Sequence, residues 1–201
     1  GSRFLWPDWL AIDTPEGTMN APDMKSATRV LQELGINKDS KIVICHRGSD
    51  VSIAARMFMT LEHLGLEGRV SFLNGGIEAW KKAGYPVTDK VSAYAKGNFS
   101  ATDNRKVADK SYVLKALQDQ SSIVVDARAK RFYDGDPTGN PRDGHISGAL
   151  NIPYPEMVDS LNSFKSVEQL GMNFQKVLPG KDKELVVYCF IGQTACVDYL
   201  A

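Results

Sequence analysis

Residues 185–201 read LVVYCFIGQTACVDYLA, and this stretch decides the fold. Its first part is apolar and β-branched, which predicts a short buried strand of a parallel sheet. The strand would end at Cys189, and a short loop containing Gly192 would then lead into a helix. Backbone N–H groups of such a loop can converge on the sulfur, and the start of a helix adds partial positive charge. Both effects favour thiolate over thiol, so we predict that Cys189 is a nucleophile near neutral pH.

The charge balance and the hydropathy of the chain limit the classes of function. Among the 201 residues, Lys and Arg number 24 and so do Asp and Glu, which argues against a general binder of nucleic acid or acidic membranes. No apolar run reaches the length of a membrane span. We therefore favour the cytoplasm. The periplasm remains the alternative, because Gly1-Ser2 reads like a cloning scar and the natural N-terminus could lie further upstream.

The use of cysteine points to chemistry on a single thiol. Cys45, Cys189 and Cys196 are too few, and odd in number, for a disulfide framework. The sequence has no Cys-x-x-Cys pair and no His-rich cluster, so we predict no metal site. Cys196 lies in the predicted helix after the loop, where we expect it to pack in the interior.

Helices and strands are predicted to alternate along the chain. Residues 1–22 hold three prolines and read as irregular, with one helical turn around 8–10. Residues 127–142 read as a basic, turn-rich loop. We expect strands at 41–45, 69–73, 122–126 and 185–189, and helices at 23–34, 51–64, 77–82, 108–118 and 167–177, the last ended by Pro179-Gly180.

The chain reads as two copies of one α/β unit. Residues 88–107 are polar and aperiodic, so we interpret them as a linker between domains at 1–87 and 108–201. The segment KIVICHRG at 41–48 echoes ELVVYCFIG at 184–192. The segment GSRFLW at 1–6 can likewise be matched with GALNIP at 148–153. On these matches the first copy lacks its start and the second lacks its end. The alternation predicts open parallel sheets flanked by helices, with ligands bound at the carboxyl ends of the strands.

Several short segments have an order and spacing that is typical of one protein family. They are AAR at 54–56, LNGGIEAW at 73–80, GYPV at 84–87, VVDAR at 124–128, Arg131-Phe132, PRDGHISGALNIP at 141–153 and YCFIGQTA at 188–195. Together they resemble the rhodanese superfamily in its tandem form, the thiosulfate and 3-mercaptopyruvate sulfurtransferases. The resemblance covers nearly the whole chain and implies two rhodanese-like domains, the first inactive and the second catalytic.

The resemblance also implies a mechanism. Cys189 would take sulfur from a small anionic donor, thiosulfate or alternatively mercaptopyruvate, and hold it as a persulfide for a cyanide or thiol acceptor. Arg131 and Arg142 would hold the donor, because a planar guanidinium pairs with carboxylates and sulfonates. No metal or organic cofactor is implied. The remaining residues expected to bind substrate are those of the loop: Phe190, Ile191, Gly192, Gln193 and Thr194.

The cysteine loop departs from both kinds of sulfurtransferase. Cys189 is followed neither by the basic residue that is typical of the thiosulfate enzymes nor by the Gly-Ser-Gly type of the mercaptopyruvate enzymes. The sequence therefore leaves the donor open. Phe190 and Ile191 make the mouth of the loop apolar, which favours a larger or less charged partner.

Two other classes of function compete with a sulfurtransferase. Cysteine phosphatases share this fold, but they need a Cys-x5-Arg loop to hold phosphate. The sixth residue after Cys189 is Ala195, and the sixth after Cys45 is Val51, so the sequence disfavours this chemistry. A sulfur-carrier or binding module without catalysis stays open.

The remaining polar candidates read as structural. We expect Asp126 and Arg128 to form a hydrogen-bonded pair at a strand end, and His145 to hold its turn. Cys45 aligns with either Cys189 or Tyr188, and we expect it to be inactive.

Overall fold

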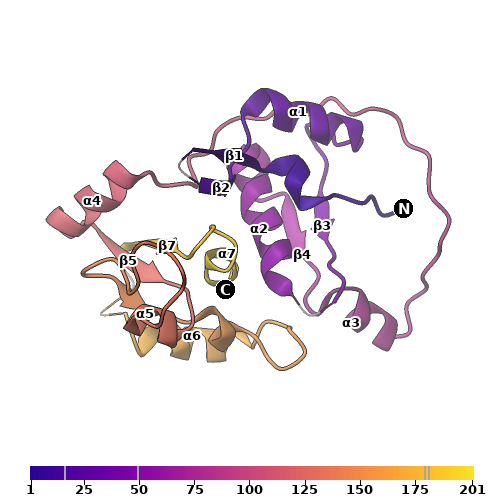
Figure 1. Ribbon diagram of the computed structural model, residues 1–201. Helices are drawn as coiled ribbons and strands as arrows, with labels where there is room; N and C mark the ends of the chain where they lie inside the picture. Colours follow the sequence, from indigo (N-terminus) through magenta and orange to yellow (C-terminus); the bar gives the residue numbers. More distant parts are fainter. Residues whose placement is uncertain (16, 49, 179, 181) are drawn as a thin grey trace. The chain divides into compact units, whose positions relative to one another are not determined.

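The computed structural model describes residues 1–15, 17–48, 50–178, 180 and 182–201. The chain divides into two compact units, Gly1–Val107 and Ala108–Ala201 (Figure 1). Each unit contains parallel strands accompanied by helices, which confirms the predicted fold class. Within the described ranges, no helix has the length and apolar character to cross a membrane.

The first unit packs helices against a pair of parallel strands. β3 (Ile42–Ile44) and β4 (Val70–Phe72) pair with Ile42 opposite Val70. The other elements are η1 (Pro7–Leu10), β1 (Ile12–Thr14), β2 (Gly17–Asn20), α1 (Met24–Glu33), α2 (Val51–Leu61), the π-helical η2 (Glu62–Leu66) and α3 (Gly76–Lys82). The core consists of Leu10, Ala27, Leu31, Leu34, Met57, Leu61, Leu64, Leu66, Val70 and Phe99.

The boundaries of α1 follow from local chemistry. Asp23 caps its start, because the Asp23 side chain accepts a hydrogen bond of 2.9 Å from the backbone N–H of Ser26. Gly35, at φ +72°, ends it with a backbone conformation that favours glycine. Between them Ala27 and Leu31 lie one turn apart and are buried, as the helical spacing predicts.

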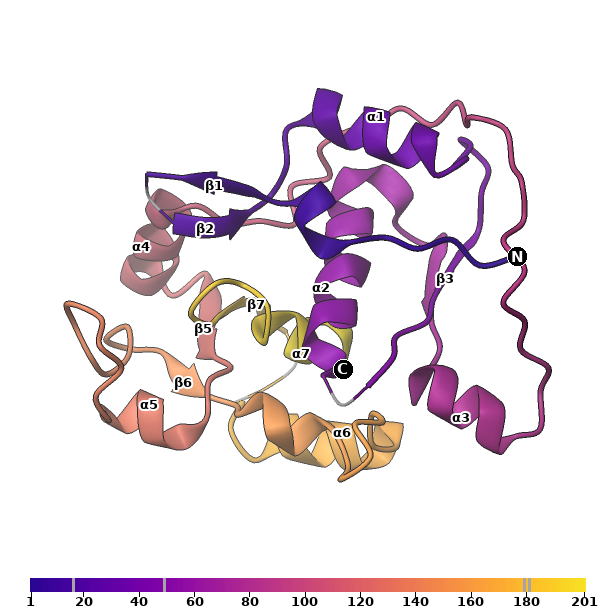
Figure 2. The ribbon, with the colours of Figure 1, turned by 45° about the vertical axis from the view of Figure 1, so that its right-hand side comes forward.

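Two predictions for the first unit are wrong. Residues 1–22 contain the expected helical turn as η1, but β1 and β2 also form an antiparallel hairpin (Figure 2). The hairpin lacks apolar alternation and is held by polar groups, since the Asn20 amide donates to Thr14 Oγ1 at 3.2 Å and to the Gly17 carbonyl at 2.7 Å. The strand at 41–45 was expected to be buried, yet Val43 is 65% exposed, because one face of β3 is open to solvent.

The segment at 88–107 has no helix or strand, but part of it packs on the first unit. The backbone N–H of Gly97 donates to the Gln32 carbonyl at 2.8 Å, and that of Thr102 donates to the Leu64 carbonyl at 3.1 Å. The Gln32 side chain donates to the Phe99 carbonyl at 2.9 Å, and Phe99 is buried in the core. Residues 97–104 are therefore packed against the first unit. A free linker between the two units is shorter than the predicted segment 88–107.

The second unit contains a three-stranded parallel sheet in the order β6-β5-β7. β5 (Ser122–Asp126) lies in the middle, and its bounds match the predicted strand. β6 (Leu150–Asn151) and β7 (Glu184–Tyr188) flank it. In Figures 1 and 2, α4 lies above these strands, and α5 and α6 lie below them. The helical elements are α4 (Lys110–Asp119), α5 (Lys130–Asp134), η3 (Tyr154–Met157), α6 (Val167–Gln175) and α7 (Ala195–Leu200).

Three details of the second unit differ from the predictions. The predicted loop at 127–142 contains the single-turn helix α5, which is too short and polar to show a helical period. The strand that ends before Cys189 is parallel as predicted, but it is half-buried rather than buried. The helix expected at 167–177 ends at Gln175. Its predicted stop at Pro179-Gly180 includes Pro179, which lies outside the described residues.

Candidate active site

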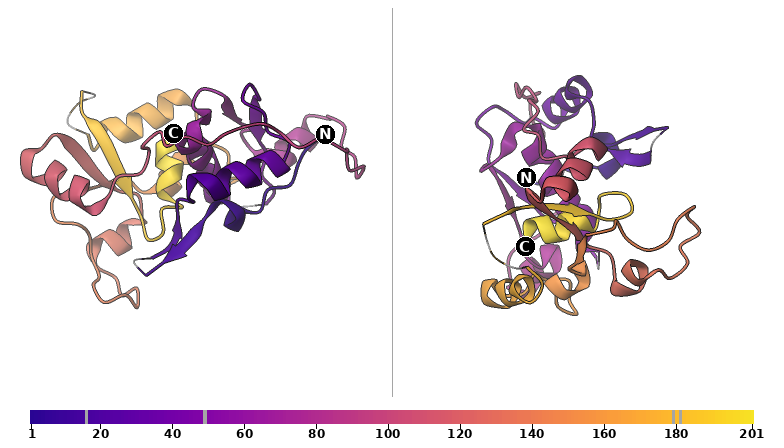
Figure 3. Two further views of the ribbon diagram at one scale, coloured as in Figure 1. Left: turned by 90° about the horizontal axis from the view of Figure 1, so that it is seen from above. Right: turned by 90° about the vertical axis from the view of Figure 1, so that its left-hand side faces the viewer.

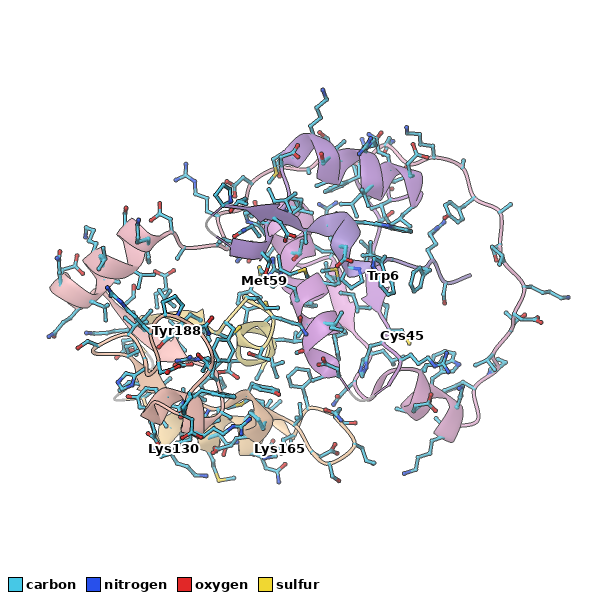
Figure 4. The ribbon with its side chains drawn as sticks, viewed as in Figure 1. Trp6, Cys45, Met59, Lys130, Lys165 and Tyr188 are labelled. Carbon is cyan, nitrogen blue, oxygen red and sulfur yellow. The ribbon has the colours of Figure 1, made fainter. Side chains whose placement is uncertain are left out.

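The carboxyl ends of the three strands of the second unit meet at one edge, and Cys189 lies there. Asp126, the last residue of β5, is opposite Tyr188 in β7 and Asn151 in β6. The pairing of β5 with β7 continues to the strand ends, where the backbone N–H of Ala127 donates to the Tyr188 carbonyl at 2.9 Å. Cys189 is the first residue beyond β7, whose course is yellow in Figure 3. Tyr188 lies among the side chains gathered at this edge (Figure 4).

The loop after Cys189 turns tightly into α7. Gly192 adopts φ +70°, a conformation that favours glycine. The thiol of Cys196 donates to the Gly192 carbonyl at 3.0 Å, so Cys196 is buried and packs beneath the loop, as predicted. Cys189 is a half-buried free thiol. Among the residues that the structure describes, no hydrogen bond reaches its Sγ, so the convergence of loop N–H groups on the sulfur stays a prediction.

Asp126 and Arg128 form the predicted pair at the end of β5. The Asp126 carboxylate accepts hydrogen bonds from Arg128 Nε at 2.9 Å and from Arg128 Nη2 at 2.6 Å. Arg128 Nη2 also donates to the Gly144 carbonyl at 2.7 Å, and both side chains are buried. The hydrogen bond to Asp126 raises the pKa of Arg128, so a fixed, buried ion pair lies at the same edge as Cys189.

An aromatic cluster forms the mouth of the cysteine loop. The Phe190 ring is 47% exposed, and the guanidinium carbon of Arg128 lies 4.7 Å from its centroid. Phe132, which α5 carries, meets Phe190 edge-on with centroids 5.3 Å apart. The predicted apolar mouth therefore includes Phe132 as well as Phe190 and the half-exposed Ile191. Sequence reasoning did not assign Phe132 to the site, although it stands next to Arg131 in a recognised segment.

The two arginines expected to bind the donor lie in different places. Arg131 belongs to α5, and its guanidinium carbon lies 4.4 Å from the Phe132 ring, which ties it to the mouth. Arg142 is exposed between α5 and β6, and within the described residues nothing joins it to the cysteine loop. Thr194 makes no capping hydrogen bond to α7 in the described part of the chain. Catalysis by Cys189 stays a prediction, and so does substrate binding by Arg131, Arg142 and the loop residues Phe190, Ile191, Gly192, Gln193 and Thr194.

Two further polar residues complete the edge. The Tyr188 hydroxyl accepts a hydrogen bond from the backbone N–H of Ile146 at 3.0 Å, and burial raises the pKa of Tyr188 to about 12. The His145 ring stacks on Tyr133 with centroids 3.6 Å apart, and its Nδ1 lies 2.7 Å from the Tyr133 carbonyl. His145 is therefore structural, as predicted.

The first unit has a cysteine in the equivalent position, directly after β3. Cys45 is exposed, and desolvation still raises the pKa of its thiol. The His46 ring stacks on Phe72 with centroids 5.5 Å apart, and burial lowers the pKa of His46. Both shifts favour the neutral forms of these side chains.

A cysteine at the carboxyl edge of a parallel sheet, followed at once by a tight loop and a helix, defines an α/β protein with a thiol at the edge where ligands of open α/β sheets generally bind. The family model of the rhodanese-like domain matches residues 1–83 and again residues 109–200. The chain therefore belongs to the rhodanese-like domain family, and its two matches are the tandem copies predicted from sequence.

Curated relatives carry two different names. The chain is 33% identical over 183 residues to the probable 3-mercaptopyruvate sulfurtransferase of Pseudomonas aeruginosa, covering 90% of the chain and 64% of that protein. It is 35% identical over 171 residues to the thiosulfate sulfurtransferase of Rattus norvegicus, covering 81% of the chain and 57% of that protein. The chain thus spans less than two thirds of the length of each.

A solved structure has the same fold. The crystal structure of SseA from Escherichia coli, a 3-mercaptopyruvate sulfotransferase with the rhodanese fold, superposes with a TM-score of 0.77. The two chains are 30% identical, and the match covers 90% of this chain and 68% of SseA.

Proposed function

We propose that the protein is a sulfurtransferase that moves a sulfane sulfur from a small anionic donor to a thiophilic acceptor, through a persulfide on Cys189. The observation that carries the proposal is the position of Cys189, directly beyond β7 at the carboxyl edge of the parallel sheet. The tight loop at Gly192 holds Cys189 between the end of β7 and the start of α7, and this position suits a site that must hold negative charge on sulfur. The relatives that are named sulfurtransferases support the same class of reaction.

The reaction would proceed in two displacements. The Cys189 thiolate attacks the outer sulfur of thiosulfate, an S–S bond to Cys189 forms, and sulfite leaves with the electron pair of the broken S–S bond. Cyanide, or the thiolate form of a thiol acceptor, then attacks the outer sulfur of the persulfide. The bond to Cys189 breaks, thiocyanate or a new persulfide leaves, and the Cys189 thiolate is restored.

Thiosulfate is our first candidate for the donor, and 3-mercaptopyruvate is the second. Both are small anions that Arg131 and Arg142 could hold through paired hydrogen bonds. With mercaptopyruvate the C–S bond would break and pyruvate would leave, after its carbanion takes a proton from water. The relatives and SseA carry both kinds of name, so they do not favour one donor.

We further propose that the first unit is catalytically silent. The neutral forms favoured at Cys45 and His46 support this assignment. The unit would then serve the second one by binding or by structure alone.

Mass spectrometry of the intact protein tests the proposal. After incubation with thiosulfate, and separately with mercaptopyruvate, we expect a gain of one sulfur atom that peptide mapping assigns to Cys189 and that cyanide removes. The donor that gives the faster gain is the preferred one. A folded protein that gains sulfur from neither donor would contradict the proposal and favour a binding module.

A further inference from the structure

Asp198 is a buried carboxyl group that the proposed chemistry does not use. It lies in α7, the helix that follows the cysteine loop, and it is only 5% exposed. Neither of its carboxyl oxygens has a hydrogen-bond partner among the residues that the structure describes. An ionised carboxylate in such a place would lose its hydration without compensation, so the protonated acid is favoured.

The charges around Asp198 act in the same direction. The pKa of Asp198 is raised to about 9, first by burial and then by the negative charges of Cys189, Asp126 and Glu156. Glu156 lies in η3 and Cys189 directly follows β7, and both of these elements contact α7. Asp126 is the last residue of β5, which pairs with β7. Arg128, the buried cation at the end of β5, is paired with Asp126. Among the described residues, every charge that shifts the pKa of Asp198 is negative.

We propose that Asp198 is a positioning residue for the sulfur chemistry: it stays protonated beside the cysteine loop, so that the negative charge can reside on the sulfur of Cys189. The interaction between the two groups is mutual, because a thiolate disfavours an ionised Asp198 and an ionised Asp198 disfavours a thiolate. An ionised Asp198 would equally oppose the persulfide anion and an incoming anionic donor. Asp198 transfers no proton in this scheme and only keeps its own.

The scheme predicts an alkaline limit to activity. Below about pH 9 Asp198 is neutral, and the sulfur anion is unopposed. Above that pH a second anion forms beside the loop, and sulfur transfer should fall. The Asp198→Asn variant keeps the shape of the side chain and cannot ionise, so the fall should disappear.

The first test needs no sulfur donor. Infrared spectroscopy of the full chain follows the C=O band of protonated carboxyl groups as the pH rises from about 5 to about 10. We expect a band with a midpoint near pH 9 that Asp198→Asn lacks and that the control Asp182→Asn, at an exposed position of the same unit, retains. Alkylation of Cys189 with iodoacetamide gives a neutral thioether, so it should lower the midpoint. A midpoint near the ordinary value of about 4, or a midpoint that alkylation does not move, would overturn the proposal.

The second test rests on the proposed function. We expect kcat/KM for sulfur transfer by the wild type to fall about tenfold above pH 9, while Asp198→Asn shows no such fall. An equal fall in both proteins would overturn the proposal. If neither protein transfers sulfur, the proposed function has failed, and the rate of Cys189 alkylation against pH replaces the transfer rate as the readout.

Stability provides a control for folding. The pKa of Asp198 is higher in the folded state than in the unfolded chain, so its contribution to stability is full below pH 3.8 and is lost as the pH rises toward about 9. The Tm of the wild type should therefore decline over this range relative to that of Asp198→Asn. If Asp198→Asn does not fold, the infrared midpoint of the wild type and its response to alkylation still decide the proposal.

Discussion

Cys45 and Cys189 each follow a parallel strand and precede a helix, but the residue after the cysteine has opposite surroundings in the two units. In the first unit, the His46 carbonyl accepts a hydrogen bond from the backbone N–H of Ile77 at 2.9 Å. A Cβ at Gly76 would collide with that carbonyl and lie 3.0 Å from the His46 ring, so only glycine fits there. In the second unit, Phe190 is half-exposed and lies over Arg128.

This difference shows that a strand–loop–helix pattern alone does not make a reactive site. Both loops follow a parallel strand. In the first loop, His46 packs against Phe72 and α3, whereas in the second loop Phe190 lies at the exposed mouth beside Phe132. The neighbouring strand end also differs, because β5 brings the Asp126–Arg128 pair to the edge beside Cys189. If these neighbours separate a silent loop from a working one, substitutions in the two units should have unequal effects on sulfur transfer.

Replacing the two cysteines should give the largest contrast. Cys189→Ser should abolish the persulfide and lower kcat/KM for sulfur transfer by at least about a thousandfold, because the nucleophile is lost. Cys45→Ser should change kcat/KM by less than about twofold, since local desolvation raises the pKa of the exposed Cys45 and favours its neutral thiol. Steady-state kinetics with thiosulfate and cyanide measure both. A large loss in Cys45→Ser would break the comparison and make the first loop a second sulfur site.

Removing the buried carboxylate beside the second loop should have the next largest effect. Asp126→Ala leaves the Arg128 guanidinium buried without its partner, and we expect the free energy of unfolding to fall by about 3–5 kcal/mol. Urea denaturation measures the change.

The matched control is Asp134→Ala, which removes the partner of Lys130 in an exposed ion pair of the same unit. Its cost should stay below about 1 kcal/mol. Equal costs for the two variants would mean that the Asp126–Arg128 pair does not organise this edge of the sheet.

How far the sequence predicts the fold depends on the strength of local patterns. The run at 122–126 is β-branched and bounded by polar residues, so the predicted strand and β5 coincide. The β1–β2 hairpin and α5 escaped prediction because neither has an apolar period: polar side chains hold the hairpin, and α5 is a single turn. Hydrogen bonds from one side chain fix the hairpin, and contacts such as that of Phe132 with Phe190 accompany α5. Neither kind of contact leaves a periodic pattern in the sequence.

The candidate site divides in the same way. Cys189 could be found from sequence because a strand end, a glycine-containing loop and a helix start are all local signals. The contact between Phe132 and Phe190 could not, since α5 must first return to the edge of the sheet. Asp198 also escaped prediction. An acidic residue in a helix reads as solvent-facing, and only the packing of α7 on β7 and η3 reveals that it is buried.

The two arginines should differ in their effect on donor binding. Arg131 stacks on Phe132 at the mouth, whereas Arg142 is exposed in the loop before β6. We expect Arg131→Gln to raise KM for thiosulfate about tenfold with little change in kcat, because a paired hydrogen bond to the anion is lost. Arg142→Gln should raise KM by less. The measurement is the initial rate against thiosulfate at a saturating concentration of cyanide, and a larger effect at Arg142 would move the donor site away from α5.

The smallest effect should come from the exposed ring that most clearly separates the two loops. Phe190→Ala removes a half-exposed aromatic surface that a bulky acceptor could cover, worth about 1 kcal/mol, or about fivefold in kcat/KM. We expect that loss with phenylmethanethiol as acceptor and no loss with cyanide, which is too small to reach the ring. Competition between the two acceptors for the persulfide measures the ratio directly.

Val167→Ala is the matched control, because it shortens an exposed apolar side chain of the same unit outside the mouth. It should leave the ratio of the two acceptors unchanged. An equal loss with cyanide in Phe190→Ala would mean that the ring supports Arg128 and the loop rather than the acceptor. Phe190 would then have a packing role, as His46 has in the first loop. The two loops would differ only in the Asp126–Arg128 ion pair, which lies at the edge beside Cys189.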